Sequence, residues 1–354
     1  MLNWLLVFVP VAIALEYLAP DRTLWIFAAS ALAIIPLAGW MGHATEQLAV
    51  RTGEGIGGLL NATFGNAAEL IIALAALRAG LHEVVKASLA GSIVGNILLV
   101  LGAAMLAGGL RHRPEQHFNA PGARSQATML TLAVIALILP AAYVRLGATP
   151  GLPSLSVWIS AVLIGVYAAN LLFALVTHQS LFAGSHEAEE GAHAAPWSAG
   201  RAGLVLAAAT AAIAWMSEIL VGALEPATHA LGLNQVFVGV FVVAILGNAA
   251  EHATAVTAAL KNRMDLSLSI AIGSSVQVAL FVAPLLVLLS YAVGPAPMDL
   301  AFSGGLVLAV LLAVLITGQI AGDGRSDWLK GVQLLAVYVI LGLAFFFAPS
   351  PVRH

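Results

Sequence analysis

The chain has 354 residues, of which 61% are hydrophobic and only 9% are charged, and its formal net charge at pH 7 is −3. Soluble domains carry about 25% charged residues, so this composition predicts a polytopic membrane protein in contact with the lipid bilayer. The absence of cysteine excludes disulfides, thiolate metal sites and thiol catalysis. The slightly acidic balance gives no sign of a nucleic-acid partner.

Apolar stretches of about 20 residues, the length needed to cross roughly 30 Å of hydrocarbon, recur along the chain. The eleven predicted spans are residues 2–19, 23–47, 55–80, 84–109, 126–147, 154–177, 200–223, 233–260, 265–291, 297–319 and 328–349. The longest polar interruption, HQSLFAGSHEAEEGAHAAPW at residues 178–197, falls between the sixth and seventh spans. It divides the chain nearly in half.

Two short motifs occur twice at the same separation. GNAAE at residues 65–69 recurs at residues 247–251, and Gly-Ser at 91–92 recurs at 273–274, in both cases after 182 residues. This repetition predicts one leading span followed by two repeats of five spans. An odd number of spans per repeat places the repeats in opposite membrane orientations, which is typical of secondary transporters.

These patterns divide the chain into four parts. We expect a leading transmembrane helix at residues 1–20, a first five-helix repeat at 21–178, an acidic cytoplasmic linker at 179–199 and a second five-helix repeat at 200–354. The predicted fold class is an all-α polytopic membrane protein with eleven transmembrane helices.

The Lys and Arg residues are unevenly shared between the two ends of the predicted spans. Nine lie on the side of the N-terminus and five on the other side. The positive-inside rule therefore predicts a cytoplasmic N-terminus, with the C-terminus on the opposite side of the membrane. We expect an integral protein of the cell inner membrane.

Two glutamates lie inside apolar spans. Glu69 is near the middle of the third predicted span, and Glu251 is slightly past the middle of the eighth. An ionised carboxylate at this depth costs at least about 2.5–3.5 kcal/mol. A protonated glutamate that only bonds a neighbouring helix is the alternative, but the whole GNAAE setting occurs twice. Two carboxylates suit a hard divalent cation, because Ca²⁺ takes roughly 6–8 oxygen ligands.

Neutral oxygens accompany both glutamates. Asn66 and Asn248 add amide oxygens within the GNAAE motifs, and the glycines before them permit closely approached or unwound backbone. The candidate ligands on the partner spans are Ser92, Asn96, Ser274 and Gln277. Helix packing would also explain small polar residues such as Ser92 and Ser275, because small residues let helices approach closely.

Two further acids occupy related places on the second and seventh spans. Glu46 follows a threonine and Glu218 follows a serine. We assign Glu46 and Glu218 to proton coupling, as proton-access or gating groups. Glu69 and Glu251 are the other two proton-coupling residues. The alternative is an end-of-span residue that reaches the membrane interface.

Four segments resemble the repeat signatures of the cation/proton exchangers, the Ca²⁺/H⁺ antiporters of the calcium/cation antiporter superfamily. They are GGLLNATFGNAAELI, SLAGSIVGNILLVLG, GNAAEHATAV and IAIGSSVQVALFV. The resemblance implies an eleven-helix fold in which Glu69 and Glu251 bind Ca²⁺ and exchange it for protons. It also implies help from Ser92, Ser274 and the backbone carbonyls that precede the glutamates. Ca²⁺ and H⁺ are then transported ions, and we expect no cofactor.

Competition between a metal ion and protons for the same carboxylates explains antiport without reference to any family. If both glutamates lose a proton for each Ca²⁺, at least two protons move against each ion. We expect alternating exposure to come from spans two and seven sliding against spans three, four, eight and nine.

Two alternatives to Ca²⁺/H⁺ exchange remain. The first is a Na⁺, K⁺ or Mn²⁺/H⁺ antiporter on the same scaffold, which the sequence separates poorly from a Ca²⁺ carrier. The second, an intramembrane enzyme, is weaker, because no nucleophile elbow, metal-binding histidine pair or phosphate loop accompanies the acids.

Overall fold

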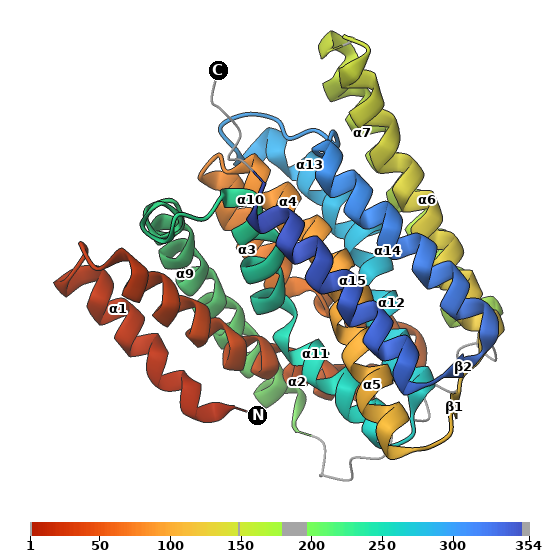
Figure 1. Ribbon diagram of the computed structural model, residues 1–354. Helices are drawn as coiled ribbons and strands as arrows, with labels where there is room; N and C mark the ends of the chain where they lie inside the picture. The colour runs from red at the N-terminus through yellow and green to blue at the C-terminus, as the bar shows by residue number, and fades with distance from the viewer. Residues whose placement is uncertain (1, 148, 179–196, 349–354) are drawn as a thin grey trace.

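The computed structural model describes residues 2–147, 149–178 and 197–348, most of which lie in long helices packed side by side (Figure 1). The elements in chain order are η1 (Asn3–Val7), α1 (Phe8–Leu18), α2 (Thr23–Phe64), α3 (Ala67–Arg78), α4 (His82–Val94), η2 (Gly95–Val100), α5 (Leu101–Arg111), β1 (Gln116–His117), α6 (Ala120–Arg145), η3 (Thr149–Gly151), α7 (Leu152–Leu172), η4 (Phe173–Thr177), α9 (Ala199–Leu231), α10 (Gln235–Val238), η6 (Gly239–Val243), α11 (Ala244–Leu260), α12 (Met264–Gln277), η7 (Val278–Val282), α13 (Ala283–Val293), α14 (Gly304–Asp323), β2 (Arg325–Ser326) and α15 (Trp328–Phe346).

The helices confirm the predicted membrane architecture. Among the described residues, nine helical segments are long and apolar enough to cross a membrane, and Asn3–Leu18 is a shorter apolar helix. Together with α3, these segments make eleven passes. Because this number is odd, the two ends lie on opposite sides: α1 begins at the lower end of the bundle in Figure 1, and α15 ends at the upper end. The chain is a polytopic helical membrane protein with one leading helix and two five-helix repeats. The predicted acidic linker falls almost entirely on residues 179–196, outside the described ranges.

The third predicted span, residues 55–80, is not a single helix. Helix α2 continues to Phe64, and the chain turns at Gly65 and Asn66 before α3 begins at Ala67. Glu69 therefore lies in the first turn of the 12-residue α3, after a break in the predicted span and not inside one continuous helix. Hydropathy measures how strongly a segment prefers lipid, and it does not show whether the backbone stays helical. The polar residues after the second predicted span therefore indicate a membrane boundary, although helix α2 continues through them.

A small antiparallel ladder joins the two repeats at the lower end of the bundle, where the sequence indicated only helices. Gln116 of β1 pairs with Ser326 of β2. The Gln116 side chain also donates hydrogen bonds of 2.9 Å to the Ala259 carbonyl and to Asn262 Oδ1. A two-residue strand is too short to show an alternating pattern, which is why it escaped prediction. The three loops that carry Gln116, Asn262 and Ser326 were predicted to lie on the same side of the membrane, and in the structure they lie together.

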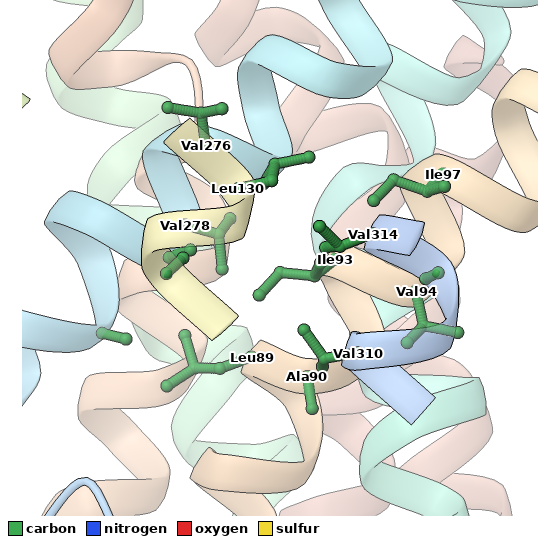
Figure 2. Packing of buried hydrophobic residues seen from close by; sticks show 14 of the residues in the cluster. Leu89, Ala90, Ile93, Val94, Ile97, Leu130, Val276, Val278, Val310 and Val314 are labelled. Atoms are coloured by element: carbon green, nitrogen blue, oxygen red, sulfur yellow. The ribbon is translucent and has the colours of Figure 1, made fainter. Parts of the chain in front are cut away.

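Buried apolar side chains form two clusters. The larger one joins α3 to α7 with α11 to α15, and part of it is visible in Figure 2, where Ile93 of α4, Leu130 of α6 and Val314 of α14 converge. The smaller one joins α1, α2 and α9 to α3 and to single residues of α4, α10, η6 and α11. We name the α1, α2 and α9 bundle the gate bundle and the remainder the core. Helices α2 and α9 pack along each other within the gate bundle.

The topology predicts which loops are reached from each side of the membrane. In the cysteine-free chain, His117→Cys places a thiol on the 68% exposed side chain in β1, and Leu146→Cys places one on the 83% exposed position after α6. We expect an impermeant thiol reagent to label the first only from the cytoplasm and the second only from the opposite side. Labelling of both from one side would contradict the number of passes and the inversion of the repeats.

Candidate functional site

The two intramembrane glutamates come together where α3 meets α11. Glu69 is 3% exposed, and Glu251 lies in the interior of α11, close enough for the two carboxylates to interact electrostatically. Gly247 makes this approach possible, because a Cβ there would lie 3.3 Å from the Cα and Cβ of Glu69. The backbone of α11 therefore packs directly against the residue that carries the first carboxylate.

Each glutamate is held by a serine, and each serine is bonded to an asparagine of the opposite repeat. On one side, the Ser92 hydroxyl donates to Glu69 Oε1, and Asn248 Nδ2 donates to Ser92 Oγ at 3.0 Å. The second Asn248 N–H donates to the Ala244 carbonyl, also at 3.0 Å. Asn248 is thus fixed by its own helix while it orients a serine that belongs to the other half of the chain.

The second half has a related arrangement, but here the serine donates to the asparagine and not to the glutamate. Ser274 interacts with Glu251, and its hydroxyl donates to Asn66 Oδ1 at 2.8 Å. Asn96 Nδ2 donates to Ser274 Oγ at 3.2 Å, and His252 Nε2 lies 3.1 Å from Asn96 Oδ1. Four of the predicted polar residues, Asn66, Asn248, Ser92 and Ser274, therefore form two matching contacts that cross between the repeats.

A second close approach places Ser92 in this network. At Gly91, the residue before it, a Cβ would lie 2.4 Å from the Val240 carbonyl oxygen in η6. Only glycine permits that distance, so α4 packs backbone to backbone against the segment that leads into α11. The Gly-Ser motif thus combines a contact that needs glycine with a hydroxyl that faces the carboxylate.

One oxygen of each carboxylate has no hydrogen-bond partner among the described residues. In the described part of the chain, Glu69 Oε2 and Glu251 Oε2 are buried without a hydrogen-bond partner. Leaving such an acceptor unsatisfied costs about 1–3 kcal/mol, and more if it is charged. A proton or a cation placed between the carboxylates removes that cost.

The donor set is small for a resident metal. Within the described ranges, no three His, Asp or Glu side chains gather as potential ligands. The available set is two carboxylates supplemented by amide and hydroxyl oxygens, which suits hard cations such as Ca²⁺. A site with only two charged ligands also allows a bound ion to be released again.

The remaining predicted residues lie in different places. Asn96 belongs to the network, and Gln277 is buried on α12 one turn beyond Ser274. Among the described residues, Glu46 and Glu218 make no hydrogen bond to the network. Glu46 is 61% exposed and lies 3.6 Å from His43 Nδ1, and Glu218 pairs with Arg78.

Two residues outside the predicted ligand and proton-coupling residues also make polar contacts. His252, which directly follows Glu251, contacts Asn96. Arg78 forms an ion pair with Glu218. Its position nine residues after Glu69, at the last residue of α3, was the available signal.

Comparison with known proteins shows the class. Residues 22–176 and 202–347 match the sodium/calcium exchanger protein family, and the chain belongs to that family. The two matched ranges correspond to the two five-helix repeats. The family is one of membrane exchangers and not of enzymes, which confirms the resemblance found in the repeat motifs.

Individual relatives match over nearly the whole length. The chain is 49% identical to the Ca(2+)/H(+) antiporter of Synechocystis sp., over 98% of this chain and 97% of the relative. It is 45% identical to the Ca(2+)/H(+) antiporter ChaA of Bacillus subtilis, over 91% and 92% of the two chains. The solved structure of native YfkE superposes with a TM-score of 0.85 at 39% identity, covering 98% of this chain and all of that one.

The serines that face the carboxylates predict a contrast with their neighbours. Ser92→Ala removes a bond to a carboxylate and should lower Ca²⁺ affinity by roughly 10- to 100-fold, since bonds to charged groups contribute about 1.5–3 kcal/mol. Ser274→Ala removes the bond to Asn66 beside Glu251 and should lower the affinity by a smaller factor. Ser88 and Ser275 are matched controls, because they are buried on the same helices but donate to Val85 and Ala271 carbonyls. Calorimetric Ca²⁺ titration should show near-normal affinity for the two control alanine variants. Equal losses in all four variants would contradict the assigned network.

Proposed function

We propose that the chain exchanges Ca²⁺ for H⁺ across the membrane, with Glu69 and Glu251 binding either one Ca²⁺ or protons. The observation that carries this proposal is the pair of buried carboxylates, each with one unpartnered oxygen, at the contact between the repeats. Two relatives, both named as Ca(2+)/H(+) antiporters, support the same ions.

Each residue of the network has a distinct role in this proposal. Glu69 Oε2 and Glu251 Oε2 supply the charge that binds the cation. Asn66 and Asn248 orient the serines and supply amide groups next to the carboxylates. Asn96 and Gln277 complete the polar lining from the partner helices. Ser92 and Ser274 hold the two carboxyl groups in place and offer hydroxyl oxygens.

Coupling follows from competition. Two carboxylates held away from water require a compensating positive charge, and protons and Ca²⁺ bind to the same oxygens. If the site moves between the two sides only when it is filled, a site that has released one species on one side must bind the other species there before it can return. The net result is antiport, with at least two protons moving against each Ca²⁺ when both glutamates are used.

Alternating exposure requires two bodies that move relative to each other. The smaller apolar cluster, through which the gate bundle packs on α3, α4 and α11 of the core, supports a motion of α2 and α9 against α3, α4, α11 and α12. The ladder between β1 and β2 connects parts of the core and leaves the gate bundle outside that connection. We further propose that the N-terminus is cytoplasmic, in the inner membrane of the cell.

A monovalent ion or Mn²⁺ is the second candidate substrate. Two carboxylates compensate the charge of one divalent ion, whereas a single Na⁺ or K⁺ would leave a negative charge away from water. The site therefore favours a divalent ion over Na⁺ or K⁺, and flux measured across a panel of ions that includes Mn²⁺ ranks the alternatives directly.

Removal of either carboxylate charge should abolish transport. Glu69→Gln and Glu251→Gln should each reduce ΔpH-driven Ca²⁺ uptake into proteoliposomes to background, because each removes a charge that the ion needs. Glu83→Gln is the control, since Glu83 is 56% exposed at the start of α4 and should transport normally when neutralised. Near-normal flux in either site variant would refute the site.

Proton competition also predicts how Ca²⁺ affinity depends on pH. Acid fills the carboxylates with protons and alkali empties them, so apparent affinity should fall as pH falls through the titration of the pair. Each proton displaced contributes up to about tenfold per pH unit, which gives a log–log slope between one and two for two coupled carboxylates. Calorimetric titration from roughly pH 6 to 9 measures the slope. An affinity independent of pH would leave a Ca²⁺-binding protein without proton coupling.

A further inference from the structure

An ion pair connects the gate bundle to the core. Arg78, the last residue of α3, lies 2.9 Å from Glu218 Oε1 on α9, and the two side chains are 63% and 52% exposed. Helix α3 also carries Glu69 in its first turn. The pair therefore bridges the helix that holds one candidate ligand and a helix that must move if the site is to change sides.

The inverted repeat contains the elements of a second such pair. Glu46 on α2 is the first-repeat counterpart of Glu218, and Lys261 directly follows α11 as Arg78 ends α3. Helix α2 packs against both α11 and α9. In the described part of the chain, Glu46 makes no ion pair with Lys261, and its neighbouring titratable group is His43 on the same helix.

The two gate helices are held to each other at one end. Trp197, just before α9, donates its N–H to Gln47 Oε1 at 2.8 Å and accepts at its carbonyl from Arg51 Nε at 2.5 Å. Its ring stacks on Trp40 at 6.0 Å between centroids and lies under the Arg201 guanidinium at 4.5 Å. Helices α2 and α9 are thereby tied, so that a displacement of one carries the other.

We propose that Arg78–Glu218 and Glu46–Lys261 are reciprocal latches, each formed when the other is broken. The structure shows the first one closed. When the gate bundle moves against the core, Glu218 leaves Arg78 at one end and Glu46 reaches Lys261 at the other, so each membrane side has its own closing contact. This inference rests on the proposed function for the purpose of the latches, which is to close one side of an exchanger at a time. The two ion pairs themselves depend only on how the gate bundle packs against the core.

The effect of each latch is expected to be modest and opposite in sign. Exposed ion pairs shift an equilibrium by roughly 1.5- to 5-fold. Glu218→Gln and Arg78→Gln should reduce the population in which the Arg78 end is closed by about this factor. Glu46→Gln and Lys261→Gln should raise it, because they destabilise the opposite state.

Spin-label distances in the cysteine-free chain test the proposal. Ala79→Cys and Gly222→Cys place labels at an exposed position just after α3 and at an exposed position of α9, both beside the first latch, and a Cβ at Gly222 meets nothing within 4 Å. Pulsed electron resonance then gives the populations of short and long distances. We expect Glu218→Gln and Arg78→Gln to favour the long distance, and Glu46→Gln and Lys261→Gln to favour the short one.

The charge-swapped double variant Arg78→Glu with Glu218→Arg checks that the contact itself is responsible. It should restore the wild-type distribution, which a loss of general stability would not do. Shifts of the same sign in all four single variants, or no shift in any, would overturn the reciprocal latches. Opposite shifts in a protein that fails to exchange Ca²⁺ for H⁺ would leave the latches standing and refute the proposed function instead.

Discussion

The cost of holding two carboxylates away from water is the constraint on which the rest of the structure depends. The break at Gly65 and Asn66 places Glu69 in the first turn of α3, where the helix dipole favours a negative charge. Gly247 allows α11 to approach that turn, and the Ser92 hydroxyl supports one oxygen of the carboxylate. These contacts compensate only part of the charge, and in the proposed function protons or a cation supply the remainder.

The same motif adopts two conformations in one molecule. Gly65 and Asn66 form a turn between helices, whereas Gly247 and Asn248 lie inside the continuous α11. Identical sequences therefore differ because of their surroundings and not because of local propensity. Inverted-repeat transporters use such differences between their halves, and here the contact between Arg78 and Glu218 adds a second asymmetry.

Much of the fold followed from the sequence, because hydropathy and an exact motif repeat report membrane spans and internal symmetry directly. The pairing of Ser92 with Asn248 did not follow, since equal spacing shows which residues are equivalent but not which ones touch. Hydropathy does not report backbone geometry, so it did not predict that α2 continues through the polar residues near Arg51. The role of Arg78 was missed because its partner lies 140 residues away.

In the proposed function, Ca²⁺ and protons occupy the same two carboxylates. Proton release on Ca²⁺ binding, measured by mixing purified protein with Ca²⁺ in weakly buffered solution containing a pH indicator, tests it most directly. Displacement predicts between one and two protons released per Ca²⁺ bound, and fewer when Glu69→Gln leaves one titrating carboxylate. Saturable Ca²⁺ binding that releases no protons at any pH would contradict the claim.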